Sequence, residues 1–251
     1  MNETKVVKLV EDIELNNPVL IVGLPGVGHV GKLVAEHLIE EIDSEKLIEL
    51  YSPHFPPQVI VDDDNTIRLV NNEIHVCRSD QRDILILVGD HQSTTTEGHY
   101  ELCDVYLDIA EEFGVERIYT LGGFPTGQLT HKDEVICAVN NPSMIEELKD
   151  AGVTFKKGEP GGGIVGASGL ILGLSKFRNI EAACLMGMTS GYIVDPKSSQ
   201  SLLKVLCNIF DFEVDAGPLE ERAKEMEKIV AKLMEKEQQK MIQEEDLRYI
   251  G

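Results

Sequence analysis

Short apolar runs alternate with amphipathic stretches along most of the chain, which is typical of strands alternating with helices. The apolar runs predict strands at 5–9, 18–24, 46–51, 58–63, 66–71, 74–79, 83–89, 116–121, 134–139 and 181–187. Apolar residues at helical spacing predict helices at 29–41, 97–113, 142–150, 164–177 and 197–211. The runs at 18–24 and 83–89 are unbroken, as expected for strands covered on both faces. We therefore predict an α/β fold with three layers, α/β/α, around a mostly parallel or mixed sheet.

The segment 46–79 departs from this alternation. It contains four short strand-like runs with no helical pattern between them, and a proline-rich loop at 52–57. Runs of strands separated by turns are typical of hairpins. We interpret this segment as a hairpin-rich excursion of the same domain.

The C-terminal part is expected to be a single long helix. Gly217 and Pro218 interrupt the pattern, and a helix is predicted over 219–245. Its apolar stripe weakens after Leu233, so we expect the helix to pack at its start and project into solvent near its end. The predicted organisation is a core domain at 1–217 followed by a C-terminal helix and flexible tail at 218–251. The residues of the stripe are Leu219, Ala223, Met226, Val230 and Leu233.

The charge of the chain limits its partners. The 251 residues include 23 Lys and Arg against 44 Asp and Glu, which gives a net charge of −21. Such a surface repels nucleic-acid backbones and anionic membranes, so we expect neither as a partner. No apolar run is long enough for a membrane-spanning helix or a signal peptide. The five cysteines have no C-x-x-C spacing, which favours reduced, mostly buried thiols and a cytoplasmic location.

A glycine-rich loop after the run at 18–24 is the first candidate site. Gly26, Gly28 and Gly31 match the dinucleotide pattern G-x-G-x-x-G, and Gly26 to Lys32 also match G-x-x-x-x-G-K. Leu33 stands where a Ser or Thr hydroxyl would hold Mg²⁺, so triphosphate hydrolysis is not expected. Two interpretations stay open: the loop binds an anion or nucleotide, or its glycines only allow a tight, closely packed turn.

Further segments carry residues that could support chemistry. Asp90, His91, Glu97 and His99 are close in sequence, but the run at 93–96 favours a helix cap over a metal site. Ser168 and Ser190 lie in glycine-rich turns without an assignable base. The glycine turns at 122–127 and 161–166 either converge on an anion or simply allow sharp turns. We predict no catalytic residue, no metal and no cofactor.

Five ordered segments resemble the proteasome assembly chaperone 2 family, in its archaeal-type members. The resemblance spans about Val19 to Asp215 and departs from the family at Met188 and Ser190, where Glu and Pro are expected. The segments are Gly23-Leu-Pro-Gly-Val-Gly with Val30-Gly-Lys-Leu, Phe55-Pro-Pro-Gln-Val, Tyr119-Thr-Leu-Gly-Gly with Thr126-Gly, Gly163-Ile-Val-Gly-Ala-Ser-Gly-Leu, and Cys184-Leu-Met-Gly with Gly191-Tyr and Asp195-Pro-Lys.

The resemblance implies a fold similar to that of nucleoside phosphorylases. It also implies a non-enzymatic function, in which homo-oligomers bind proteasome α-subunits and assist or monitor ring assembly. ATPase-type proteasome activators end in hydrophobic-Tyr-any, and this chain ends similarly, with Tyr249 third from the end. The partner-binding residues that we predict from this likeness are Leu247, Tyr249, Ile250 and Gly251, and the alternative interpretation is a frayed C-terminus. The alternative function is a nucleoside-, nucleotide- or phosphate-binding enzyme or sensor that uses the glycine-lined cleft.

Overall fold

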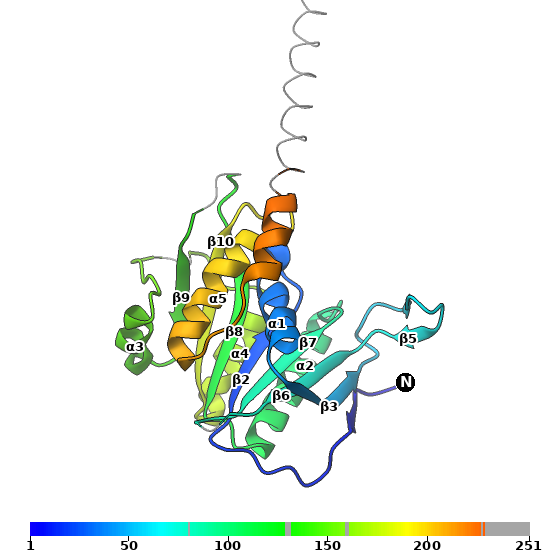
Figure 1. The fold of residues 1–251 in the computed structure, drawn as a ribbon. Coiled ribbons are helices and arrows are strands. Elements are labelled where there is room, and N and C mark those ends of the chain that lie inside the picture. Colours follow the sequence, from blue (N-terminus) through cyan, green and yellow to red (C-terminus); the bar gives the residue numbers. More distant parts are fainter. Residues whose placement is uncertain (80, 129–131, 159–160, 227, 229–251) are drawn as a thin grey trace, which may run out of the picture.

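A computed structural model describes residues 1–79, 81–128, 132–158, 161–226 and 228 (Figure 1). Within these residues an eight-stranded sheet has the order β1-β3-β6-β7-β2-β8-β10-β9, and β4 and β5 form a separate hairpin. The strands β7, β2, β8 and β10 are parallel, and the pairs on either side of them are antiparallel. The bounds are β1 Lys5–Lys8, β2 Val19–Gly23, β3 Ser44–Tyr51, β4 Val59–Val61, β5 Ile67–Leu69, β6 Asn72–Cys77, β7 Ile84–Gly89, β8 Arg117–Pro125, β9 Val135–Val139 and β10 Glu181–Thr189.

Helices cover both faces of the parallel strands. The helices α1, α3 and α5 pack on one face, and α2 and α4 pack on the other. The bounds are α1 Val30–Glu41, α2 Thr96–Glu112, α3 Ile145–Asp150, α4 Ala167–Leu174 and α5 Pro196–Phe210, with 3-10 turns at η1 Val27–His29, η2 Pro142–Met144 and η3 Ser175–Arg178. The predicted α/β fold with a mixed sheet between two helical layers is therefore confirmed.

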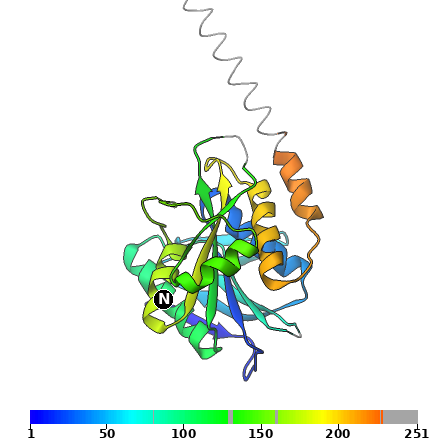
Figure 2. The ribbon, with the colours of Figure 1, turned by 90° about the vertical axis from the view of Figure 1, so that its left-hand side faces the viewer.

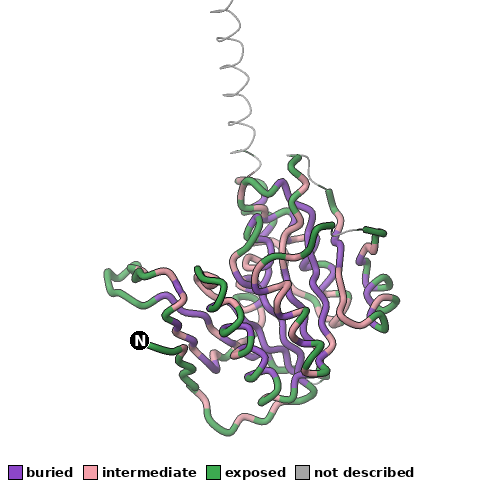
Figure 3. Tube along the Cα trace, turned by 180° about the vertical axis from the view of Figure 1, so that it is seen from behind, coloured by how far each residue is buried: buried purple, intermediate pink, exposed green. Residues whose placement is uncertain are grey.

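The core follows from the alternation of side chains along β2. Val19 and Ile21 pack with α1 and α5, whereas Leu20 and Val22 pack with α2 and α4. All four are at most 2% exposed, because successive side chains of a strand point to opposite faces and both faces are covered here. Figure 3 shows the buried strands running through the centre of the molecule.

The interpretation of 46–79 is right for one part of the segment and wrong for the other. The strands β4 and β5 form a hairpin that projects from the body (Figure 1). In contrast, β3 and β6 are members of the central sheet, since β6 pairs with β7 and β3 pairs with both β6 and β1. The sequence pattern does not reveal the pairing of β3 with β6, because the hairpin β4–β5 separates the two strands along the chain.

The C-terminal helix begins on the core. A helix spans 217–226, beside α5 in Figure 2, and Leu219 is fully buried in the cluster that contains α1 and α5. His37 of α1 also makes a 2.7 Å hydrogen bond to the carbonyl oxygen of Asp215, just before this helix. The remainder of the predicted helix and the tail, 228 excepted, lies outside the described residues. The division at 217/218 stays a prediction.

The cysteines agree with the expectation from the sequence. All five cysteines are free thiols, and four of them are buried, as predicted. Among the described helices, none combines the length and apolar character needed to cross a membrane.

Candidate functional site

The glycine-rich loop lies at the carboxyl edge of the parallel strands. The chain leaves β2 into α1 on one face of the sheet, and it leaves the adjacent β7 into α2 on the other. Such a change of face between neighbouring strands creates a crevice, which is where open α/β sheets bind ligands. The first candidate loop from the sequence therefore lies where this kind of fold usually binds a ligand.

The glycines of this loop are surrounded by neighbouring chain. Gly28 has φ +63, and a Cβ atom there would lie 2.8 Å from Oγ1 of Thr189. A Cβ atom on Gly31 would lie 2.3 Å from the carbonyl oxygen of Leu121, which is closer than atoms can approach. Gly26 differs, because a Cβ atom there would meet nothing nearer than 3.9 Å. At two of the three positions, close packing alone therefore explains the glycine.

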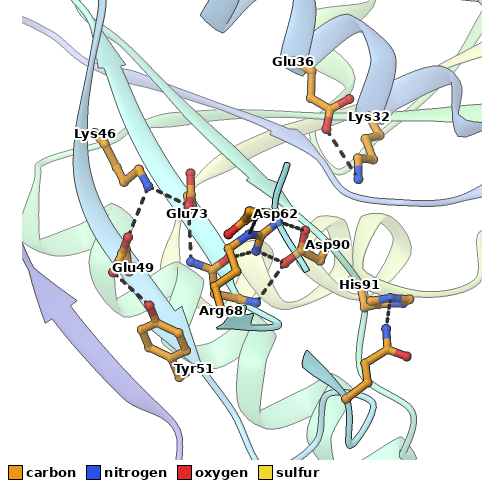
Figure 4. Close-up of polar contacts among 12 residues, drawn as sticks. Lys32, Glu36, Lys46, Glu49, Tyr51, Asp62, Arg68, Glu73, Asp90 and His91 are labelled. Atoms are coloured by element: carbon orange, nitrogen blue, oxygen red, sulfur yellow. Dashed lines mark hydrogen bonds and ion pairs between the residues drawn. The ribbon is translucent and has the colours of Figure 1, made fainter. Parts of the chain in front are cut away.

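Lys32, a candidate anion- or nucleotide-binding residue from the G-x-x-x-x-G-K pattern, lies in the first turn of α1. Its Nζ forms an ion pair of 3.4 Å with Glu36, four residues along the helix (Figure 4). Its charge also helps to lower the pKa of Asp90. No contact among the described residues shows whether Lys32 binds a phosphate, so phosphate binding by Lys32 stays a prediction.

Gln92 links separate segments at this edge of the sheet and was missed in the sequence. Its Nε2 donates a 2.6 Å hydrogen bond to the carbonyl oxygen of Pro25, and its Oε1 accepts a 2.9 Å bond from the N–H of Ala167. The side chain thus joins the loop after β2, the loop after β7 and the start of α4. Gly166 has φ +87, and a Cβ atom there would lie 2.7 Å from Oε1 of Gln92. The only local signal was a polar residue shortly after a buried strand.

The loops after β2, β8 and β10 pack directly against one another. A Cβ atom on Gly123 would lie 2.3 Å from the carbonyl oxygen of Val27, and one on Gly191 would lie 2.8 Å from Cβ of Pro125. Thr126 donates hydrogen bonds from its N–H and its Oγ1 to the carbonyl oxygen of Thr189, at 2.8 and 3.1 Å. These glycines therefore bring backbones together, as the packing interpretation predicts.

The acidic and histidine residues near α2 have structural contacts. Thr95 is the N-cap of α2 and accepts a 3.1 Å hydrogen bond from the N–H of Gly98, so the predicted cap is confirmed. His91 accepts a 3.0 Å hydrogen bond from Gln58. Among the described residues, no three His, Cys, Asp or Glu side chains are grouped so that they could hold a metal ion.

The two candidate serines also have local contacts. The carbonyl oxygen of Ser168 accepts a hydrogen bond of 3.4 Å from Oγ1 of Thr120. The Oγ of Ser190 accepts one of 3.3 Å from the N–H of Tyr192. Neither contact supplies a base to the serine hydroxyl.

A polar network runs from β3 to the end of β7 (Figure 4). Lys46 bridges Glu49 and Glu73 at 3.1 and 2.7 Å. Asn71 continues the network, since it donates to Glu73 at 3.2 Å and accepts from Arg68 at 3.2 Å. Ile74 and Val76 of β6 point into the core below α2, so Glu73 lies on the opposite face of the sheet.

Charge pairing keeps the carboxylates of this network ionised. Burial raises the pKa of Glu73, but hydrogen bonds from His75 and Lys46 outweigh burial and lower the pKa to about 2. Burial likewise raises the pKa of Asp90, and two hydrogen bonds from Arg68 of 2.6 and 2.9 Å lower it further than burial raises it. Both groups are therefore charged at neutral pH and suited to structural pairing rather than to proton transfer.

A cavity of about 510 Å³ lies at the opposite edge of the sheet, by the start of β7 and β8. Arg82, Arg117 and Phe210 are among its lining residues. Arg117 is already paired with Glu147 at 2.8 Å and with Glu181 at 2.9 Å. Because its cations and carboxylates largely offset one another, this cavity shows no strong preference for an anion.

The predicted partner-binding residues Leu247, Tyr249, Ile250 and Gly251 lie outside the described residues. Their function therefore stays a prediction from the sequence.

Comparison with known proteins now gives the relatives of the chain. The model of the PAC2 family matches residues 20–234. An uncharacterized protein of Methanocaldococcus jannaschii is 40% identical over 254 residues, covering 98% of this chain and 97% of that one. PbaB of Pyrococcus furiosus, described as an archaeal proteasome activator, is 39% identical with a TM-score of 0.88, covering 93% of this chain and all of PbaB.

A more distant solved structure shares the fold. PbaA of Pyrococcus furiosus, described as an archaeal homolog of proteasome-assembly chaperone, is 23% identical with a TM-score of 0.76. The match covers 99% of this chain and all of PbaA.

Proposed function

The chain belongs to the PAC2 family, and on this basis we propose that it is a non-enzymatic, proteasome-associated protein. In this proposal it forms homo-oligomers and binds proteasome α-subunits, partly through its C-terminal residues. Its relatives of known structure include homologues of proteasome assembly chaperones, so a general role of this kind is supported by homology.

The observation that carries the proposal is the likeness to PbaB. Identity of 39% over 93% of the chain, together with a TM-score of 0.88, is a much closer relationship than the 23% identity to PbaA. PbaB is described as an activator and PbaA as a homolog of an assembly chaperone. The closer likeness favours an action on finished proteasomes over an action on assembling rings.

The geometry of the crevice agrees with a binding protein. Glycines 28, 31, 123 and 191 are needed for close packing between loops, and Gln92 joins both sides of the crevice. The chain therefore has the glycine turns of an α/β ligand site, but these glycines contact neighbouring segments of the chain itself. A nucleotide- or phosphate-binding function remains the alternative, supported by Gly26, whose surroundings are open, and by Lys32 nearby.

The C-terminal residues supply the proposed contact. A Tyr ring can be buried while its hydroxyl makes a hydrogen bond, and a free carboxylate can pair with a lysine of the partner. A single short peptide binds weakly, but several on one oligomer gain through effective concentration. Leu247, Tyr249, Ile250 and Gly251 would therefore act together in an oligomer.

Binding of the full-length protein to finished 20S proteasomes and to isolated α-subunits tests the proposal. Deleting 247–251, or the substitution Tyr249→Ala, should weaken binding by tenfold or more, about 1.4 kcal/mol. Gln243→Ala, upstream of the final residues, is the matched control and should bind like the intact chain. Equal affinity for the intact, truncated and Tyr249→Ala proteins would show that the tail is not the contact.

Thermal shift with ATP, GMP, adenosine and phosphate tests the alternative. A ligand that binds only the folded state raises its melting temperature in a concentration-dependent way. We expect no shift with these four compounds. A saturable shift that Lys32→Ala abolishes would favour the ligand-binding function.

A further inference from the structure

The hairpin β4–β5 has an apolar face that the described part of the chain leaves open to solvent. Its register pairs Val59 with Leu69 and Val61 with Ile67, so the four side chains lie on one face of the hairpin. They are 46, 51, 65 and 67% exposed in that order. These four residues are named the hairpin face. Figure 3 shows the hairpin as an exposed projection from the body.

The opposite face of the hairpin is fixed to the body. Ile60 packs against the core cluster below α2, and Arg68 donates two hydrogen bonds to Asp90. The hairpin is therefore held in one position while its aliphatic face points outward. A two-stranded hairpin is marginally stable alone, and a contiguous exposed aliphatic patch marks an interaction surface. Because the aliphatic face is held outward, it stays exposed to water unless a partner is bound to it. A permanent partner therefore suits this face better than a transient one.

An apolar hollow adjoins the base of the hairpin. A hollow of about 650 Å³ lies there, named the basal hollow. It is lined by aromatic, proline and aliphatic residues, with few charges: Met1, Tyr51, Ser52, Pro53, Phe55, Pro56, Pro57, Gln58, Val59, Leu69 and Val70. One molecule thus carries an apolar ridge, with Val61 and Ile67 at its outer end, and an adjoining apolar hollow that shares Val59 and Leu69 with it. A two-fold interface requires this combination, because each copy must supply both halves of the contact.

Charge complementarity points to the same partner. The turn of the hairpin carries Asp62, Asp63 and Asp64; Asp62 lies 3.5 Å from Arg68, and Asp64 bonds to Thr66. Within the described residues, Asp63 has no ion-pair partner. Lys5 likewise has none there, and it pairs in β1 with Tyr51, which lines the basal hollow. Asp63 at the hairpin turn and Lys5 beside the hollow thus carry opposite charges that are available to a second copy.

We propose that the hairpin face and the basal hollow form a reciprocal interface between two copies of this chain. In this interface the hairpin of each copy packs into the basal hollow of the other, and Asp63 pairs with Lys5 across it. This inference rests on the homo-oligomer of the proposed function and assigns the surface through which its copies associate.

The mass of the full-length protein in solution tests the interface. Multi-angle light scattering at micromolar concentration should give a multiple of 27.8 kDa for the intact chain. The double substitution Val61→Glu with Ile67→Glu should reduce the mass to 27.8 kDa with an unchanged circular dichroism spectrum. The matched control is Val165→Glu with Phe177→Glu, at aliphatic and aromatic side chains that are 95 and 85% exposed elsewhere, and it should keep the intact mass. A monomeric intact chain, or a double variant that keeps the intact mass, overturns the proposal.

A charge exchange tests the contact without removing apolar side chains. Lys5→Glu and Asp63→Lys should each weaken self-association at least tenfold, because each places like charges across the interface. The two substitutions together should restore association to within about threefold of the intact chain. Failure of the combined variant to associate more tightly than the single variants would overturn the pairing of the hairpin tip with β1.

Binding to α-subunits separates this inference from the proposed function. An intact chain that self-associates through the hairpin but does not bind α-subunits supports the interface and contradicts the proposed function. A hairpin variant that keeps its mass but loses α-subunit binding assigns the hairpin face to the proteasome and overturns the inference.

Discussion

Gly31 of α1 lies directly against the carbonyl oxygen of Leu121 in β8, so that a Cβ atom would come within 2.3 Å of that oxygen. This close approach lets α1 pack on β8 and β2 at once. Gly23 at the end of β2 contributes to the same contact, since a Cβ there would lie 2.2 Å from Cβ of Ala35. The glycine loop is therefore part of the packing of the first helix.

Gly31→Ala should destabilise the protein by about 2–3 kcal/mol, because the helix must shift away from the backbone of β8. Gly26→Ala is the matched control: its backbone is extended and its surroundings are open, so its effect should stay within about 0.5 kcal/mol. Urea unfolding monitored by circular dichroism measures both. Equal effects of the two substitutions would contradict the packing interpretation.

Gln92→Ala should lower the free energy of unfolding by about 1–2 kcal/mol, since it removes the partners of the Pro25 carbonyl oxygen and the Ala167 N–H. Gln58→Ala is the control at the same residue type, because its hydrogen bond to His91 is exposed. Chemical denaturation of both variants checks this prediction. A Gln92 variant no less stable than the Gln58 variant would mean that the crevice does not depend on this bridge.

Glu73→Gln should make the free energy of unfolding less dependent on pH between pH 2 and pH 4.5. The folded-state pKa of Glu73, about 2, lies below the ordinary value of 4.5. The pairing therefore stabilises the fold above about pH 4.5, and this contribution is lost as the pH falls toward 2. We expect the substitution to lower the free energy of unfolding by about 1–2 kcal/mol at pH 7, a figure reduced to allow for the partial exposure of the site. At pH 2 we expect almost no change.

Unfolding free energies measured between pH 2 and pH 7 test this dependence. Glu45→Gln, on an exposed position of the neighbouring strand, is the control and should follow the curve of the intact protein. A Glu73 variant whose curve runs parallel to that of the intact protein would contradict the assigned pairing.

Arg68→Met should release the hairpin β4–β5 from the body without unfolding the core. Amide exchange over 59–69 should rise at least tenfold, because the two hydrogen bonds to Asp90 fix the hairpin. Lys46→Met, at the far end of the same polar network, should leave exchange in the hairpin unchanged. Hydrogen exchange measured by mass spectrometry distinguishes the two. Unchanged exchange in the Arg68 variant would show that other contacts hold the hairpin.

Much of the fold could be predicted because its elements have strong local patterns. The unbroken runs at 18–24 and 83–89 became the adjacent central strands β2 and β7. Likewise, the spacing at 197–211 became α5, with Leu202 and Leu206 fully buried. In contrast, the place of β3 in the sheet was missed, since its partners β1 and β6 are separated from it by other segments of the chain.

The candidate site was predictable only in part. The glycine spacing located the loop correctly, because a strand followed by a glycine turn and a helix is a local arrangement. Whether those glycines face a ligand or a neighbouring loop depends on residues far away in sequence, such as Leu121 and Thr189. Gln92 was missed for the same reason, as its partners lie in two other loops.

The position of β2 in the sheet has a consequence for how the protein is made. This strand is synthesised before both of its neighbours, β7 and β8, which begin at Ile84 and Arg117. Its apolar residues must therefore wait for distant partners, and such long loop closures slow folding. Until β8 has been synthesised, β2 exposes apolar side chains and unpaired backbone groups, which makes the nascent chain prone to aggregation. A protein that we propose to serve the proteasome thus has, in its own central strand, a reason to need protection while it folds.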